Sequence, residues 1–178
     1  MTPNVEAITS YDFKASDELL LDTNVWLFVY GPQSPGNSKV EVYSKAFNKI
    51  LTARCRIYID VLIVSEFINT YARLQWRLVA PDVNDFKTFR KSREFKPVAQ
   101  AIASDVKRVF RHCARVENSF AVLDINDLID DYAVGNFDFN DQILADLCKK
   151  KGLKLVTDDG DFKSQGVPVI TANMRLLV

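Results

Sequence analysis

The residues of this chain with the clearest chemical potential are acids that follow apolar segments. Asp22 ends the run LLLD, and Asp158 and Asp159 follow the run LKLVT. Open parallel sheets bind ligands beyond the carboxyl ends of their strands, so we expect these acids at one edge of a sheet. Carboxylates that lie a few ångströms apart repel each other, and a bound divalent cation removes that cost.

Two predicted helices are expected to bring further carboxylates to the same edge from their first turns. Glu66 lies among apolar residues early in one helix, and Asp141 lies at the start of another. Oxygen ligands without His or Cys favour hard ions such as Mg²⁺ or Mn²⁺. Such ions activate water and stabilise the charge that develops on a phosphodiester, so the acids indicate metal-dependent phosphodiester chemistry.

Each acid also has a purely structural interpretation. Asp22 can cap a following helix, Asp141 can interact with a helix dipole, and Glu66 can be a solvated helix residue. At least one acid of the last cluster is expected to serve only a turn. The sequence does not decide which member of that cluster it is: Asp158, Asp159 or Asp161.

Chemistry based on His or Cys has little support. The chain has a single histidine, His112, and three cysteines far apart, Cys55, Cys113 and Cys148. They form no CxxC pair, so we expect no disulfide framework, a reducing compartment and a cytoplasmic location. No apolar run of about 18 residues is present, and the first residues are acidic rather than signal-like, so we expect no membrane segment and no signal peptide.

Predicted strands and helices alternate along the chain, which is typical of an α/β fold with a mainly parallel sheet of about five strands. The predicted strands are Leu19–Asn24 with an extension through VWLFVY, Arg56–Asp60, Ser119–Leu123, Leu153–Val156 and Pro168–Ile170. The predicted helices are Lys39–Ala53, Val61–Val79, Asp82–Arg93, Pro97–Arg115, Asp124–Ala133 and Asn140–Lys151. A length of 178 residues, 48% of them hydrophobic, suits one domain spanning 1–178.

The charges are segregated although the formal net charge is zero. Lys87–Arg115 contains nine basic residues and two acids, whereas Glu117–Asp161 contains eleven acids and four lysines. A basic segment beside an acidic one favours a polyanion held near a cation site. Two solvated helix faces would give the same counts, and composition alone does not separate these interpretations.

Four acidic signatures resemble those of PIN-domain ribonucleases, including VapC-type toxins. They lie in LLLDTNVW, in VSEFINTYAR, and in FDFNDQILADLCKKKGLKLVTDDGDF, which carries two of them. The resemblance runs from about Leu19 to Ile170 with the signatures in the family's order. A basic helical segment at about 82–118 is longer than the minimal family pattern, and we expect it to be an insertion.

The resemblance implies a fold, an activity and roles for particular residues. The fold is a three-layer α/β/α sandwich, and the activity is Mg²⁺- or Mn²⁺-dependent endonucleolytic cleavage of RNA. Asp22, Glu66 and Asp141 would be metal ligands. The fourth acid would be Asp159, with Asp161 behind it and Asp158 as a further candidate. The residues that would orient ligands or water are Asn24 and Thr157. Toxin members of the family pair with a small antitoxin, and many form homodimers.

The basic segment would contact RNA phosphates, with Lys107, Arg108 and Arg111 as the expected residues.

Two other functions have to be weighed. A phosphatase of the haloacid-dehalogenase type also begins with a strand-end Asp, but it needs an acid where this chain has Asn24. A non-catalytic RNA- or protein-binding module on the same fold would leave its clustered acids without a use.

Overall fold

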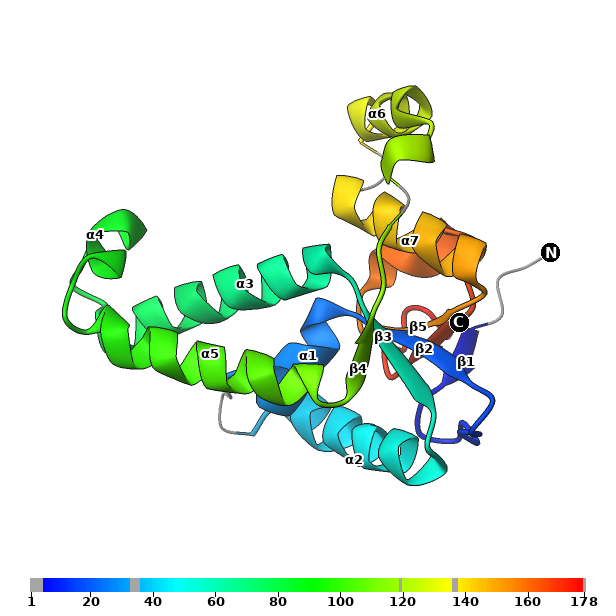
Figure 1. Cartoon of the computed structure of the whole chain (residues 1–178), viewed down its shortest axis with the longest axis horizontal. Coiled ribbons are helices and arrows are strands. Elements are labelled where there is room, and N and C mark those ends of the chain that lie inside the picture. Colours follow the sequence, from blue (N-terminus) through cyan, green and yellow to red (C-terminus); the bar gives the residue numbers. More distant parts are fainter. Residues whose placement is uncertain (1–4, 33–35, 119, 136–137, 178) are drawn as a thin grey trace.

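A parallel sheet lies between two layers of helices in the computed structural model, which describes residues 5–32, 36–118, 120–135 and 138–177 (Figure 1). The strands are β1 (Val5–Ala7), β2 (Glu18–Leu21), β3 (Arg56–Ile59), β4 (Cys113–Arg115), β5 (Lys154–Val156) and β6 (Val169–Thr171). The α-helices are α1 (Thr23–Tyr30), α2 (Ser38–Ala53), α3 (Val61–Val79), α4 (Phe86–Arg90), α5 (Phe95–Phe110), α6 (Ile125–Ala133) and α7 (Phe139–Lys151). Two short 3-10 helices are η1 (Phe120–Val122) and η2 (Gly160–Ser164). The predicted three-layer α/β/α sandwich is confirmed.

The sheet places the two strands that precede the acids next to each other. Its order is β1-β6-β5-β2-β3-β4, and every pairing among the described strands is parallel. Leu20 of β2 stands opposite Leu155 of β5 and is completely buried. Helices cover both faces of the sheet, which explains why Leu19–Leu21 of β2 and Leu155 and Val156 of β5 are all buried.

The helices form the two outer layers and an extension beside the sheet. Figure 1 shows α1 and α2 on one side of the sheet and α7 on the other. Helices α3 and α5 pack side by side and extend away from the sheet, with α4 at their far end. We call α3, α4 and α5 the helical arm. Helix α6 stands apart, beyond α7.

The prediction of a strand at Ser119–Leu123 is wrong. Phe120–Val122 is the 3-10 helix η1, and Ser119 lies outside the described residues. The strand is β4 instead, a three-residue edge strand that pairs with β3. The helix predicted to reach Arg115 therefore ends at Phe110. Strand β1 was not predicted, which makes the sheet six strands rather than about five.

Two further expectations about secondary structure are wrong. The segment VWLFVY does not extend a strand, because it forms most of α1. The helix expected over Asp82–Arg93 is confined to α4, five residues long. Helix α3 has the predicted bounds, and the Asp60 carboxylate caps it by accepting the Leu62 N–H at 2.8 Å. Helix α7 ends at Gly152, whose φ of +68° is the left-handed conformation that glycine favours.

Three large aromatic side chains, on α1 and in the helical arm, pack into or against the core. Trp26 and Phe89 are completely buried, and the Trp76 indole N–H donates to the Val83 carbonyl at 2.9 Å. All three cysteines are free thiols. Within the described ranges, no helix combines the length and the apolar character needed to cross a membrane.

Candidate metal centre

Asp22 is fixed at the carboxyl end of β2. Its Oδ1 accepts the Thr23 N–H at 2.6 Å, so the carboxylate does cap α1 as the structural interpretation proposed. Its Oδ2 accepts the Thr157 hydroxyl at 2.6 Å and the Asn24 amide at 2.5 Å. Both oxygens of Asp22 therefore accept hydrogen bonds from the chain, so its role as a helix cap is confirmed, and its role as a metal ligand stays a prediction.

Asn24 and Thr157 tie the ends of β2 and β5 together. The Asn24 amide nitrogen donates to the Thr157 hydroxyl at 3.1 Å, and its carbonyl oxygen accepts the Asp158 N–H at 3.1 Å. The Asp159 N–H donates to the same Thr157 hydroxyl at 2.9 Å. We call Asp22, Asn24 and Thr157 the Asp22 network. It fixes the backbone from which Asp159 extends.

Glu66 is connected to this network through a residue to which sequence reasoning assigned no role. The Thr23 hydroxyl donates to Glu66 Oε2 at 3.1 Å. The sequence predicts Glu66 in the first turn of its helix, but the residue lies in the second turn of α3. The position of Thr23 in the motif DTN, between Asp22 and Asn24, was the sequence feature that could have indicated this role. Thr23 is the first residue of α1.

Three acids converge closely enough to share one cation. Asp141 lies in the first turn of α7, and Asp159 and Asp161 lie at the start of η2, where the Asp161 N–H donates to Asp159 Oδ1 at 3.0 Å. Each offers one carboxylate oxygen, and these oxygens all lie within 4.8 Å of one another. Oxygen ligands lie about 2.0–2.1 Å from Mg²⁺, so two ligands on opposite sides of the ion are about 4 Å apart, and a small adjustment of these side chains would let them share one ion. We call these three residues the oxygen cluster.

Asp158 is separated from the oxygen cluster by its own partners. Its Oδ1 accepts Lys39 Nζ at 2.6 Å and the Tyr43 hydroxyl at 2.9 Å, both from α2. The Tyr43 hydroxyl also reaches the Thr157 carbonyl at 3.0 Å, and the Asn173 amide reaches the Asp158 carbonyl at 2.7 Å. These contacts attach the loop after β5 to α2, so the Asp158 side chain stabilises the position of that loop.

The electrostatics of the site oppose ionisation of its acids. Burial raises the pKa of Asp141 to about 8, and the charges of Asp22, Asp159, Asp138 and Glu66 add to that shift. Burial also raises the pKa of Asp22 to about 6, although hydrogen bonds from Thr157 and Thr23 act in the other direction. Glu66 is an exposed residue, yet partial desolvation of its carboxyl group raises its pKa.

No protein cation relieves this repulsion in the part of the chain that the structure describes. The ion pairs there engage other acids, and Asp138 serves as the cap of α7 by accepting the Asn140 N–H at 2.8 Å. The possible metal ligands in and beside the oxygen cluster, among the described residues, are carboxylate and hydroxyl oxygens rather than imidazole or thiolate groups. This donor set fits a hard divalent cation such as Mg²⁺ or Mn²⁺.

A comparison with known families identifies the fold that carries this site. The family model of the PIN domain matches residues 19–167, which include the Asp22 network and the oxygen cluster. The chain belongs to the PIN-domain family. A search of curated proteins finds no match to it. PIN domains are generally nucleases that use divalent metal ions, and the acidic cluster of this chain agrees with that description.

The basic residues of this PIN domain differ in how far their charges are engaged by other residues of the chain. The Arg108 guanidinium lies 4.4 Å from the Tyr30 ring centroid and is 3.0 Å from Asp105 Oδ1, so much of its charge is engaged within the chain. Lys107 and Arg111 are exposed. Phe89 is buried and packs edge-on against Phe95, with ring centroids 5.4 Å apart, so these two rings pack within the helical arm.

Proposed function

We propose that this PIN domain is a Mg²⁺- or Mn²⁺-dependent endoribonuclease that hydrolyses phosphodiester bonds of RNA. The single observation that carries the proposal is the oxygen cluster, where three carboxylate oxygens lie within 4.8 Å of one another. The Asp22 network beside it supports the same function, because it adds a fourth carboxylate in a fixed orientation.

The proposed roles of the residues follow from their contacts. Asp141, Asp159 and Asp161 would supply oxygens to the metal, and Asp22 would face it in an orientation set by Asn24 and Thr157. A bound Mg²⁺ or Mn²⁺ would activate water and stabilise the negative charge that develops on the phosphodiester. Glu66, held by the Thr23 hydroxyl, would complete the acidic surroundings or accept a proton from water.

The residues that could act as protein nucleophiles are poorly suited to that role. Burial raises the pKa values of the Cys113 and Cys148 thiols to about 12, so neither is a thiolate near neutral pH. His112 Nε2 lies 3.1 Å from the Tyr30 hydroxyl, within the packing of α1 against the arm. A metal-assisted attack by water needs none of these residues.

A phosphatase of the haloacid-dehalogenase type is a weaker candidate. That chemistry needs a general acid two residues after the strand-end Asp, where this chain has Asn24. The Asn24 amide donates to both Asp22 and Thr157, so it stabilises the charged form of Asp22 and has no acidic proton to transfer.

A non-catalytic module on the PIN fold is the remaining alternative, and the metal dependence of cleavage separates it from the proposed enzyme.

Cleavage of single-stranded RNA is expected to require a divalent cation. Mn²⁺ or Mg²⁺ should support cleavage, EDTA should abolish it, and added Mn²⁺ should restore it, because the ion would activate the attacking water and stabilise the charge that develops on the phosphodiester. The measurement is a time course with end-labelled RNA, and mapping of the product ends should give 5′-phosphates and 3′-hydroxyls. Cleavage that persists in EDTA would contradict the proposal, and intact RNA with Mn²⁺ bound would favour the non-catalytic module.

The basic segment, at about 82–118, is proposed to be an insertion in a single domain that contacts RNA phosphates. Arg111→Ala should weaken RNA binding and lower the slope of log affinity against log salt by about 0.7, the value expected for one phosphate contact on a single strand. Lys45→Ala, which removes an exposed lysine of α2, is the matched control. Fluorescence anisotropy at several salt concentrations measures both, and equal slopes would remove this role from Arg111.

The finer proposal, a toxin of a toxin–antitoxin pair with a small antitoxin and a homodimeric state, rests on the family resemblance. Expression of the chain in a bacterial host should then arrest growth, because the nuclease would act on cellular RNA. Expression of Asp22→Asn should not. Colony counts after induction measure the difference. Normal growth with an active enzyme would remove the toxin role and leave the nuclease proposal intact.

A further inference from the structure

The loop after β5 is fixed at the residues that precede its two acids of the oxygen cluster. The backbone N–H of Asp158 donates to the side-chain carbonyl of Asn24 at 3.1 Å, and its backbone carbonyl accepts the Asn173 amide at 2.7 Å. One residue earlier, the Tyr43 hydroxyl donates to the Thr157 carbonyl at 3.0 Å. Three other parts of the chain, namely α1, α2 and the segment after β6, therefore hold this loop.

Two side chains of α2 join the same loop to the segment after β6. Lys39 Nζ donates to Asp158 Oδ1 at 2.6 Å and to the Ala172 carbonyl at 3.2 Å. The Tyr43 hydroxyl lies 2.9 Å from Asp158 Oδ1 and accepts the Ala172 N–H at 3.0 Å. Lys39 and Tyr43 have the i, i+4 spacing that places two residues on one face of a helix. We call these two residues the α2 brace.

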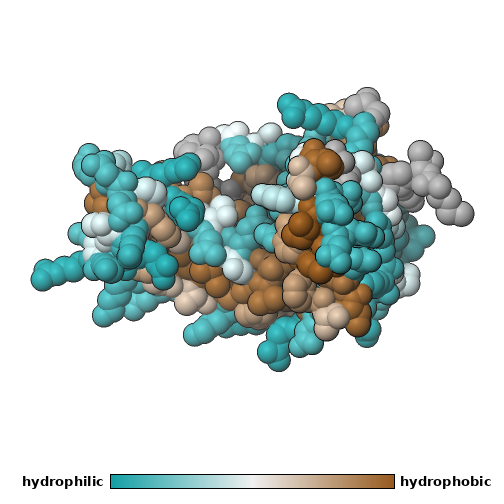
Figure 2. Space-filling view, turned by 90° about the horizontal axis from the view of Figure 1, so that it is seen from above, coloured by the Kyte–Doolittle hydropathy of each residue, from teal (hydrophilic) through white to brown (hydrophobic). Residues whose placement is uncertain are grey.

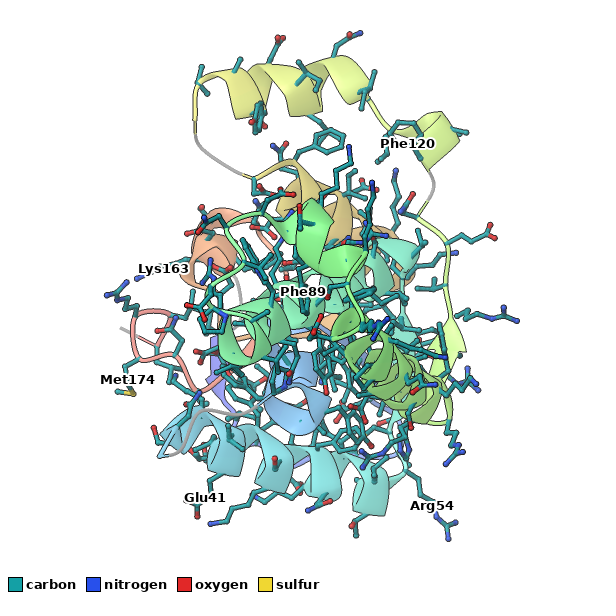
Figure 3. The ribbon with its side chains drawn as sticks, turned by 90° about the vertical axis from the view of Figure 1, so that its left-hand side faces the viewer. Glu41, Arg54, Phe89, Phe120, Lys163 and Met174 are labelled. Atoms are coloured by element: carbon teal, nitrogen blue, oxygen red, sulfur yellow. The ribbon has the colours of Figure 1, made fainter. Side chains whose placement is uncertain are left out.

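The parts that the α2 brace joins lie along one side of the molecule. Figure 3 shows Glu41 of α2, Met174 after β6 and Lys163 of η2 in succession on that side. The 3-10 helix η2 also contacts the segment after β6, because Lys163 Nζ donates to the Arg175 carbonyl at 3.3 Å. The two acids at the start of η2 are therefore held both by the loop before them and through η2 itself.

The α2 brace is largely shielded from solvent. Tyr43 is completely buried, and its ring stacks on Phe28 with the centroids 5.3 Å apart. The side chains of Lys39 and Asp158 are 32% and 19% exposed, so their ion pair is partly removed from water. Salt screens such a pair less than it screens a pair of exposed charges. We therefore expect the brace to hold its geometry more firmly than a surface contact would.

A firm contact matters here because the acids that it supports repel one another. Two acids of the oxygen cluster, Asp159 and Asp161, lie on the braced segment, whereas Asp141 lies on α7. Without a cation, like charges favour a wider separation of this segment from α7. A segment that is already held in place loses less freedom when an ion binds, so the ion binds more tightly.

We propose that Lys39 and Tyr43 are positioning residues of the metal centre, which keep the oxygen cluster assembled before a metal ion binds. The inference rests on the proposed function, since it concerns the metal site of the proposed nuclease. Neither residue belongs to the four acidic signatures, so sequence reasoning assigned them no role. Residues that support metal ligands in this way typically contribute about tenfold to a hundredfold to metal affinity.

The test is the affinity of the full chain for Mn²⁺ alone, measured at one fixed pH from the electron paramagnetic resonance signal of the free ion. Tyr43→Phe removes only the hydroxyl, and Lys39→Met removes the ammonium group but keeps an unbranched side chain. Each variant is expected to bind Mn²⁺ about tenfold more weakly. Loss of a positive charge near the site would by itself favour a cation, so weaker binding by Lys39→Met reports lost positioning.

Matched controls separate positioning from a general loss of stability. Tyr71→Phe also removes the hydroxyl of a buried tyrosine that binds an acid, because the Tyr71 hydroxyl donates to Asp105 at 3.0 Å. That contact lies in the helical arm, whose outer end is covered by hydrophilic side chains at the left of Figure 2. Lys45→Met breaks the exposed ion pair of Lys45 with Glu41 on α2. Both controls should bind Mn²⁺ like wild type, and circular dichroism checks that every variant is folded at the temperature of the measurement.

A double-mutant cycle tests whether Lys39 acts through Asp158. Asp158→Asn removes the charge that Lys39 binds, so it should weaken Mn²⁺ binding by a similar factor. The chain with both Lys39→Met and Asp158→Asn should then bind within about twofold of the weaker single variant, since the two residues share one contact. Losses that multiply to about a hundredfold would mean independent effects and would overturn the positioning role of Lys39.

The contrary results for this proposal differ from those for the nuclease. Equal Mn²⁺ affinities for wild type, Tyr43→Phe and Lys39→Met would overturn the positioning role, even where RNA is cleaved. Tighter binding by Lys39→Met would overturn it as well. Weaker binding by both variants, with RNA that stays intact, would support positioning and contradict the nuclease. A wild-type chain that binds no Mn²⁺ would overturn both proposals.

Discussion

Asp141→Asn is expected to slow Mn²⁺-dependent RNA cleavage by about a hundredfold to a thousandfold. The substitution preserves the size of the side chain but removes one of the three carboxylates of the oxygen cluster. A bound metal ion contributes several kcal/mol to stabilisation of the transition state, and each 1.36 kcal/mol corresponds to about tenfold in rate. Single-turnover cleavage of end-labelled RNA, with enzyme in excess, measures the change directly.

A matched control for this experiment lies on the same helix. Asp146 also belongs to α7, but its carboxylate pairs with Lys150 at 2.9 Å, away from the oxygen cluster. Asp146→Asn should therefore cleave RNA at nearly the wild-type rate. Asp22→Asn belongs in the same series and should resemble Asp141→Asn. Rates for Asp141→Asn and Asp146→Asn that agree within about twofold would contradict a metal-binding role for Asp141.

The centre of the site could be predicted from sequence because it rests on the strongest local signals. Two apolar runs that end in acids indicate buried parallel strands, and β2 and β5 are indeed neighbours. Asp22, Asn24 and Thr157 then meet because the carboxyl ends of these strands coincide. Helix α7 follows the same logic, since a start near Asn140 and an end at Gly152 place Asp141 in its first turn.

The assignments that the sequence left open depended on residues far along the chain. Asp158, Asp159 and Asp161 are equivalent acids in a turn-rich segment, and nothing local separates them. Lys39 and Tyr43 of α2 make the distinction, because they bind the Asp158 carboxylate and leave its neighbours beside Asp141. A contact between residues more than a hundred positions apart has no signature in a single sequence.

The misplaced strand has a physical cause of the same kind. The apolar composition of SFAVL is typical of a buried strand, yet Phe120 is 57% exposed and Val122 is 73% exposed in η1. The true edge strand, β4, has only three residues, and Ala114 and Arg115 are exposed. Burial on one face is slight at such an edge, so the usual alternation of apolar and polar residues is absent. Pairing with β3 determines its position instead.

Mn²⁺ binding is expected to tighten by about a hundredfold between about pH 6 and pH 8, because the ion must displace a proton from Asp141. Burial and neighbouring acids raise the pKa of Asp141 to about 8, so its carboxyl group is mostly protonated below that pH. Each pH unit below the pKa then costs about a factor of ten in apparent affinity. Asp22, whose pKa is about 6, is half ionised at pH 6 and almost fully ionised at pH 8, so it adds only about a factor of two. Isothermal titration in buffers of different ionisation enthalpy measures both the affinity and the proton release.

The same pKa fixes the sign of the stability change in EDTA. The folded chain keeps the Asp141 proton up to about pH 8, whereas the unfolded chain loses it near the ordinary value for Asp. Between these values the folded state binds more protons, so the free energy of unfolding should fall as the pH rises. Mn²⁺ should reverse this trend in wild type, and Asp141→Asn should flatten it. A Mn²⁺ affinity that does not change with pH, together with identical melting profiles for the two proteins, would mean that Asp141 is an ordinary ionised surface acid.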